Sequence, residues 1–453
     1  MAPKRNEPCH CGSGKKYKHC HMKEDNRNRT DIQPPSLILP TVNPSLTIDD
    51  FEEGDLAFEQ WENLYDTFHA SNYEEKVTLV RTAIRKAVLD EELVFEFFNE
   101  LYSSMVARGH LQAFMDLVTL LKSNQGVEYV AEKHWFFFWE IPVAFALEDT
   151  EALEEVTEHL IRSNHDGTDL FYPVFNLLLY HDCRDILLKA ISKYRPDIHP
   201  KENWEYSKSS INQQLADIIV LNYIQEQAKD DLLDARHIAR LFIAIEPYMV
   251  EAPDRDGLIE FISWAGGLTN GQWLIGDFVL QSKGRGLWDK DVAQDPAIAN
   301  LRDLSSAFLH YAYRVEKIPL LKADLARDHL MAYIIERQLG ELDDNGYSRN
   351  SKHRSRPSKV RNRKKTGVLL PDYDTLMQYL PRFYGSMGDG VYAGAALLEL
   401  IPAWVRFLQS KDLATEDEGL SALRDRERLS KLLLQTETEA LMLDPVLLAN
   451  LQK

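Results

Sequence analysis

Cysteine is scarce in this sequence, with four residues in 453. Four cysteines are too few to crosslink a chain of this length, so a disulfide-stabilised secreted fold is excluded. No window reaches the roughly 18 uninterrupted apolar residues that a membrane span needs. The two nearest candidates, 135–147 and 391–408, contain charged residues and are predicted to be buried helices. No apolar stretch follows the basic N-terminus, so we expect no secretory signal and a cytoplasmic protein.

The sequence signatures of common enzyme classes are also missing. There is no His-Glu-x-x-His helix, no Gly-x-Ser-x-Gly elbow and no dinucleotide fingerprint. The segment Gly12-Ser-Gly-Lys15 lacks the earlier glycine and the following Ser or Thr of a phosphate-binding loop. Cys183 lies beside His181, but neighbours on a helix point in different directions, so we expect a partly buried structural thiol. The prediction is a protein without enzymatic activity.

Basic residues are the minority, 52 against 71 acidic ones, for a formal charge of −19. They concentrate in two segments: residues 1–30 hold eight bases and three acids, and residues 349–365 hold nine bases and no acid. The remaining chain is strongly acidic and is expected to repel nucleic acids. Two interpretations of 349–365 stay open, a phosphate-binding loop and a solvated loop whose charges repel one another. Its candidate contact residues are Arg354, Arg356, Lys359, Arg361, Arg363, Lys364 and Lys365.

From Leu46 onward the apolar residues recur at helical spacing, and the alternation typical of strands is scarce. Short turns separate the predicted helices, such as Arg108-Gly109 between 92–107 and 111–123. Stacked helical hairpins of the tetratricopeptide or HEAT kind fit this pattern, and an irregular α-helical domain fits nearly as well. The fold class is therefore predicted as mainly α. Further predicted helices span 135–147, 151–163, 170–180, 185–194, 373–382, 392–409 and 420–443.

The few cysteines are clustered, because Cys9, Cys11 and Cys20 lie within twelve positions and His21 follows directly. Three thiolates and one imidazole form a closed tetrahedral set for structural zinc. A unit this small buries too little to fold alone, and bound metal supplies an apparent ~10–16 kcal/mol. Four protein ligands leave no open coordination position, so catalytic zinc is not expected.

The segment Pro8-Cys-His-Cys-Gly-Ser-Gly-Lys-Lys-Tyr-Lys-His-Cys-His21 resembles the SEC-C motif, the zinc knuckle at the C-terminus of the SecA preprotein translocase motor and in many other bacterial proteins. The resemblance implies zinc held by the three cysteines and His21. It also implies a protein or ribosomal partner, since SecA-type knuckles contact the export chaperone SecB and ribosomal components. His10 replaces the proline common in the family and is a possible competing ligand. Candidate contacts to an acidic partner are Lys15, Lys16 and Lys18.

These segments predict a small zinc knuckle tethered to a large α-helical body. The predicted function is a non-enzymatic interaction module or scaffold whose knuckle contacts a protein or ribosomal partner. An alternative is a nucleic-acid-associated protein of a mobile element or defence system that uses both basic segments. A third is an enzyme whose site is assembled from scattered residues of the body. The expected domains are a zinc knuckle over 1–25, a Pro-rich flexible linker over 26–46, a repeat-like helical domain over 47–343, a basic exposed loop over 344–367 and a C-terminal helical subdomain over 368–453.

Overall fold

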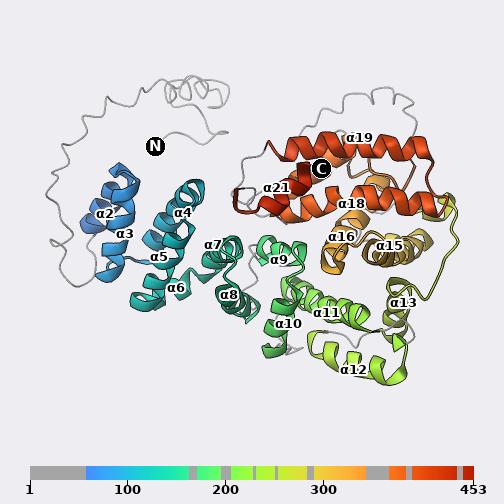
Figure 1. The fold of residues 1–453 in the computed structure, drawn as a ribbon, viewed down its shortest axis with the longest axis horizontal. Helices are drawn as coiled ribbons and strands as arrows, with labels where there is room; N and C mark the ends of the chain where they lie inside the picture. Colours follow the sequence, from blue (N-terminus) through green and yellow to red (C-terminus); the bar gives the residue numbers. More distant parts are fainter. Residues whose placement is uncertain are drawn as a thin grey trace, which may run out of the picture. The chain divides into compact units, whose positions relative to one another are not determined.

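All regular structure in the described residues is helical, and none of these residues forms a strand (Figure 1). The prediction of a mainly α fold is therefore confirmed. The class of helical repeat stays a prediction. The computed structural model describes residues 58–162, 171–194, 206–227, 231–249, 254–282, 290–342, 367–383, 390–435 and 442–452.

The helices follow one another closely along the chain. The first third contains α2 Phe58–Ala70, α3 Tyr73–Arg85, α4 Glu91–Arg108, α5 Leu111–Asn124, α6 Gly126–Ala131, α7 Lys133–Ala146 and α8 Thr150–Arg162. The middle contains α9 Phe171–Tyr180, α10 Arg184–Lys193, α11 Tyr206–Glu226, α12 Ala235–Ile245, η5 Glu246–Tyr248, α13 Arg255–Ala265, η6 Ile275–Phe278 and α14 Lys290–Ala293. The last third contains α15 Pro296–Arg314, α16 Leu320–Gln338, α17 Tyr373–Tyr379, η7 Leu380–Phe383, α18 Gly390–Ser410, α19 Glu416–Leu433 and α21 Pro445–Gln452.

The ends of α4 show how the local sequence sets the helix boundaries. The Asp90 carboxylate accepts a hydrogen bond from the Leu93 N–H and so satisfies one of the free donors of the first turn. Gly109 ends the helix at φ +70°, a left-handed conformation that glycine adopts without strain. The helix pair predicted around Arg108-Gly109 is therefore confirmed, with boundaries within a residue of those expected.

One predicted helix is wrong in its extent. The apolar pattern predicted a helix over 420–443, but α19 covers Glu416–Leu433. It begins earlier because Thr415 and Glu418 form a capping box, each side chain accepting a hydrogen bond from the other residue's backbone N–H. Asp444 then starts the separate helix α21 by accepting from the backbone N–H groups of Val446 and Leu447.

The buried side chains form two clusters that meet at α7. The first cluster collects residues of α2 to α7, and the second extends from α7 to α21. On α7, Trp139 belongs to the first cluster, whereas Phe137 and Ile141 belong to the second. A helix that is buried on both faces is hydrophobic all round, which accounts for the aromatic run at 135–139.

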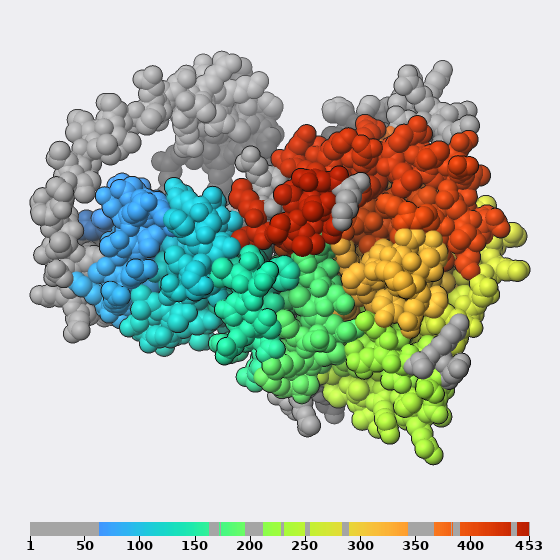
Figure 2. Space-filling model, viewed as in Figure 1, coloured from blue at the N-terminus to red at the C-terminus, as the bar shows by residue number. Residues whose placement is uncertain are grey.

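The helix α18 lies at the centre of the second cluster. It packs against α9, α15, α16, α19 and α21, so helices before and after the predicted basic loop share one core. Figure 2 shows the red C-terminal segment directly against the green segment that contains α9. Among the described helices, α18 alone is long and apolar enough to cross a membrane, yet 83% of that window is buried inside the protein. Its apolar composition is explained by this burial.

A buried carboxylate connects three helices of the first cluster. Glu140 of α7 is inaccessible to solvent; Lys122 Nζ from α5 donates to one oxygen at 2.7 Å and the Tyr129 hydroxyl from α6 donates to the other at 2.8 Å. Burial raises the pKa of Glu140, and its two partners oppose this rise by stabilising the charged form. Removal of one partner from a buried ion pair leaves a charge that nothing compensates.

We therefore expect Lys122→Met to lower the free energy of unfolding by about 3 kcal/mol at pH 8. The matched control is Lys431→Met, whose partner Glu427 is exposed, and there the change should stay below about 0.5 kcal/mol. Urea unfolding followed by tryptophan fluorescence measures both values. Similar small changes in the two variants would show that Glu140 does not depend on its lysine.

Candidate functional site

The metal ligands and basic contact residues predicted from the sequence lie outside the described residues. The structure therefore neither brings these side chains together nor separates them. Among the described residues, no group of three or more His, Cys, Asp or Glu side chains is arranged to hold a metal ion. The residues concerned are Cys9, Cys11, Lys15, Lys16, Lys18, Cys20 and His21 of the knuckle, and Arg354, Arg356, Lys359, Arg361, Arg363, Lys364 and Lys365 of the basic segment.

Cys183 lies within the described residues, between the two helices that the sequence predicts over 170–180 and 185–194. It precedes α10 as the residue at its N-terminal boundary instead of lying inside a helix, because Asp182 adopts a left-handed φ of +51° that interrupts the chain after α9. Burial, with a smaller contribution from Asp182, raises the pKa of the Cys183 thiol to about 12. His181 is directed elsewhere, with its Nε2 2.5 Å from Asp444 Oδ2. These features fit the expected structural thiol.

The helical body contains a cleft of two adjoining chambers along α11 and α16, here called the α11–α16 cleft. One chamber, of about 320 Å³, is lined by residues of α11, α13, α15 and α16, and the other, of about 260 Å³, by residues of α9, α11 and α16. Residues shared by the two linings place carboxylates at their junction. The shared residues are Asp217, Leu221, Asp324 and Asp328.

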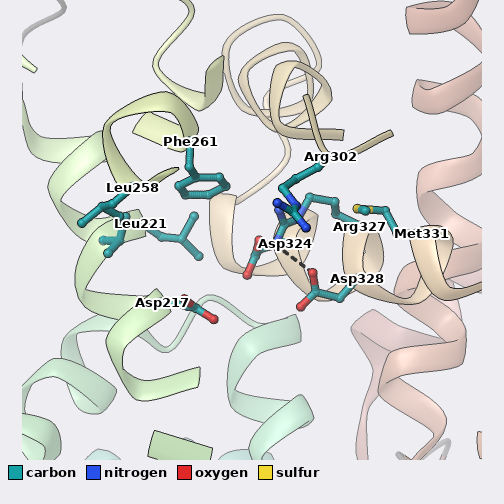
Figure 3. Close-up of a pocket in the computed structure, with 10 residues that line it drawn as sticks. Asp217, Leu221, Leu258, Phe261, Arg302, Asp324, Arg327, Asp328 and Met331 are labelled. Carbon is teal, nitrogen blue, oxygen red and sulfur yellow. Dashed lines mark hydrogen bonds and ion pairs between the residues drawn. The ribbon is translucent and has the colours of Figure 1, made fainter. Parts of the chain in front are cut away.

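Figure 3 shows that the larger chamber has an apolar side and a charged side. Leu221, Leu258 and Phe261 lie on one side, and the charged residues of α16 lie on the other, with Asp217 below them. The charged residues of α16 share one face because their spacing of three and four positions matches the helical turn. These residues are Asp324, Arg327 and Asp328.

Arg327 forms ion pairs with both neighbouring carboxylates of its helix. Its Nη2 lies 2.9 Å from Asp324 Oδ1 and 2.7 Å from Asp328 Oδ1. The Asp324 and Arg327 side chains are each 14% exposed, whereas that of Asp328 is 56% exposed. From α11, the Asp217 carboxylate accepts a hydrogen bond of 2.9 Å from Gln213 Nε2. The interior of the cleft thus holds two carboxylates and one guanidinium.

Burial and the neighbouring carboxylates both shift the pKa values of these groups. Burial, together with the charge of Asp328, raises the pKa of Asp217 to about 6. Burial raises the pKa of Asp324 to about 8, and the charges of Asp328 and Asp217 add to this against the opposing charge of Arg327. Burial alone would lower the pKa of Arg327, but the three surrounding carboxylates raise it.

Several polar atoms of the cleft lack a hydrogen bond. Asp324 Oδ1, Gln214 Oε1 and Arg327 Nε are buried and have no hydrogen-bond partner in the described residues. The 2.9 Å ion pair of Asp324 Oδ1 with Arg327 is close enough for attraction, but its angles do not make it a hydrogen bond. A buried polar atom without a partner costs about 1–3 kcal/mol, so such atoms beside a cavity are a feature of binding sites.

This cleft could not be predicted from the sequence. The spacing of Asp324, Arg327 and Asp328 is visible in the sequence, but it is equally typical of an exposed helix face. Asp217 lies far upstream, and only the packing of α11 on α16 brings it to the same cavity.

Comparison with known proteins identifies the N-terminal segment. Residues 5–23 match the family model of the SEC-C motif. The chain carries a SEC-C motif at the N-terminus of a largely helical body. The matched range contains all four predicted ligands of the knuckle and its three lysines. No curated protein and no solved structure matches the chain.

When a carboxyl group has a higher pKa in the folded protein than in the unfolded chain, the fold loses stability as pH rises. The reason is that the group ionises more easily in the unfolded chain, where its pKa is near 4. Asp217→Asn should therefore raise the free energy of unfolding by up to about 3 kcal/mol at pH 8 and change it little at pH 4. Thermal unfolding in amine-free phosphate buffer measures the difference. Asp116→Asn is the matched control, since Asp116 also accepts from a glutamine four residues earlier but is exposed. An equal gain at both pH values would contradict the raised pKa.

Proposed function

We propose that this chain is a non-enzymatic binding protein of the bacterial cytoplasm, in which the SEC-C motif binds zinc and contacts a macromolecular partner. The observation that carries this proposal is the family match over residues 5–23, which contains a complete closed ligand set. Zinc held by Cys9, Cys11, Cys20 and His21 would have no open position for a substrate. Its contribution would be to fold the knuckle and present its surface.

The charge distribution supports an acidic partner for this motif. Lys15, Lys16 and Lys18 lie between the second and third ligands, while most of the chain beyond the two basic segments is acidic. An acidic body repels acidic macromolecules, so the basic motif is the part of the chain suited to meet one. A SecB-like chaperone or the ribosome is the partner that the resemblance implies. The helical body would act as the scaffold.

A nucleic-acid-associated role is the second candidate. The observation in its favour is the run 349–365, with nine basic residues and no acidic one. Such a segment would bind phosphates by releasing condensed counterions.

The zinc assignment predicts different outcomes for different cysteines. Cys20→Ser should lower zinc content to well below one per chain, since a hydroxyl is not deprotonated near neutral pH. His21→Ala should retain part of the zinc, because His10 or His19 can replace the lost ligand. Cys183→Ser is the matched control. The zinc content of this variant should equal that of the native protein, because burial keeps the Cys183 thiol protonated. Metal analysis of the purified proteins decides, and full zinc content in Cys20→Ser would overturn the assignment.

The two candidate functions differ in the segment that holds the partner. Partners recovered from a bacterial lysate should be lost with Cys20→Ser and kept when Lys359, Arg361, Arg363, Lys364 and Lys365 are all changed to Glu. The converse pattern would favour nucleic acid, whose affinity should then fall with log[salt] at a slope of about −0.9 per phosphate contact on a duplex. Quantitative mass spectrometry and a salt titration on labelled duplex DNA provide the two measurements.

A further inference from the structure

The α11–α16 cleft is not used by the proposed function of the SEC-C motif. We propose that it binds a cationic group on an aliphatic stem, a primary ammonium or a guanidinium, held by Asp217 and Asp324 with Asp328 at the entrance. The shared chemistry is that of a small alkyl amine and of a Lys or Arg side chain presented by a protein partner.

The balance of charge selects a cation over an anion. Inside the cleft, Arg327 is already paired with Asp324 and Asp328, so its charge is not available to a ligand. Arg302 lines the larger chamber, but its side chain is exposed. Among the described residues, Asp217 accepts a hydrogen bond from Gln213 and none from a cationic side chain. An anion would add to the excess of negative charge, whereas a cation would compensate it.

The unfilled hydrogen-bonding capacity points to the same chemistry. In the described residues, Gln214 Oε1 is a buried acceptor without a hydrogen bond, and Asp324 Oδ1 has as its partner the Arg327 guanidinium, which it shares with Asp328. An ammonium group has three donors and a guanidinium has five, and neither has an acceptor. Either group can donate to acceptors of this kind, while a water or carbonyl ligand would leave the charge uncompensated. Arg327 Nε is an unpaired donor and does not compete for these oxygens.

The apolar side of the larger chamber explains why the cation should be attached to an alkyl chain. Leu221, Leu258, Phe261 and Met331 line the larger chamber opposite or beside the carboxylates. Its volume of about 320 Å³ accommodates a short alkyl chain. Arg327 already lies over the Phe261 ring at 5.4 Å, so this wall tolerates a methylene chain that ends in a guanidinium.

Binding should be linked to proton release. The titratable and charged groups facing Asp324 are Asp217 on α11, Arg327, Asp328 and His329 on α16, Arg302 on α15 and Tyr172 on α9; α13 contributes apolar residues. Because the pKa of Asp324 is raised to about 8 and that of Asp217 to about 6, a cation displaces protons that these carboxyls hold at lower pH. Affinity should therefore rise at least about tenfold from pH 6 to pH 8.

Isothermal titration of the full chain with agmatine, which carries a guanidinium and an ammonium on a four-carbon chain, tests the proposal. We expect binding at pH 8 that is weakened at least about tenfold by Asp217→Asn and by Asp324→Asn, each isosteric with the native residue. Asp116→Asn on the exposed α5 face should bind as the native protein does. A melting transition for each variant establishes that it is folded.

A second arm distinguishes the two sources of the cation. A short capped peptide that contains one Arg is compared with the same peptide that contains Gln in place of Arg. Binding of the Arg peptide without binding of agmatine identifies a protein side chain as the ligand. Binding of agmatine identifies a small amine. Absence of binding by both probes, or equal binding to the native protein and to the folded Asp217→Asn and Asp324→Asn variants, would overturn the proposal.

Discussion

The burial of α18 is the constraint on which the rest of the helical body depends. A helix this apolar has to be covered along its length, and α9, α15, α16, α19 and α21 cover it. Its one carboxylate inside this contact, Glu399, accepts hydrogen bonds from Lys322 of α16 and from the Tyr180 hydroxyl of α9. A buried carboxylate is costly without such partners, so the polar contact fixes which helices lie beside α18 as well as how closely they pack.

The position of α16 follows from this contact and determines the cleft. Lys322 and Asp324 are two positions apart, so they lie on different faces of the helix. Lys322 faces α18, and Asp324 lines the cavity toward α11. Since α16 is held on one side by a satisfied ion pair, it can keep poorly satisfied carboxylates on the other. The burial of α18 against α16 thus offsets the unfavourable proximity of the carboxylates in the cleft. Such unfavourable groups of charges are common where a protein binds a ligand.

The sequence predicted those features that depend on neighbours along the chain. The helices around Gly109 were predicted because a left-handed glycine and the apolar spacing act locally, and the SEC-C motif was found because its four candidate ligands lie within thirteen positions. The end of α19 was not predicted, since its Leu-rich spacing continues past that end. The break at Cys183 agrees with the gap between the helices predicted over 170–180 and 185–194. The cleft was missed because Asp217 and Asp324 meet only through tertiary packing.

The helical body and the proposed zinc knuckle would obtain their stability by different means. The helical body buries two apolar clusters, so we expect its fold to be independent of zinc supply. A knuckle that folds on a metal ion has its stability set by metal concentration and by the protonation of its thiols. The carboxylates of the cleft respond instead to protons between about pH 6 and pH 8, according to the pKa values of Asp217 and Asp324. If the SEC-C motif binds zinc as proposed, metal and protons would act on separate parts of one chain.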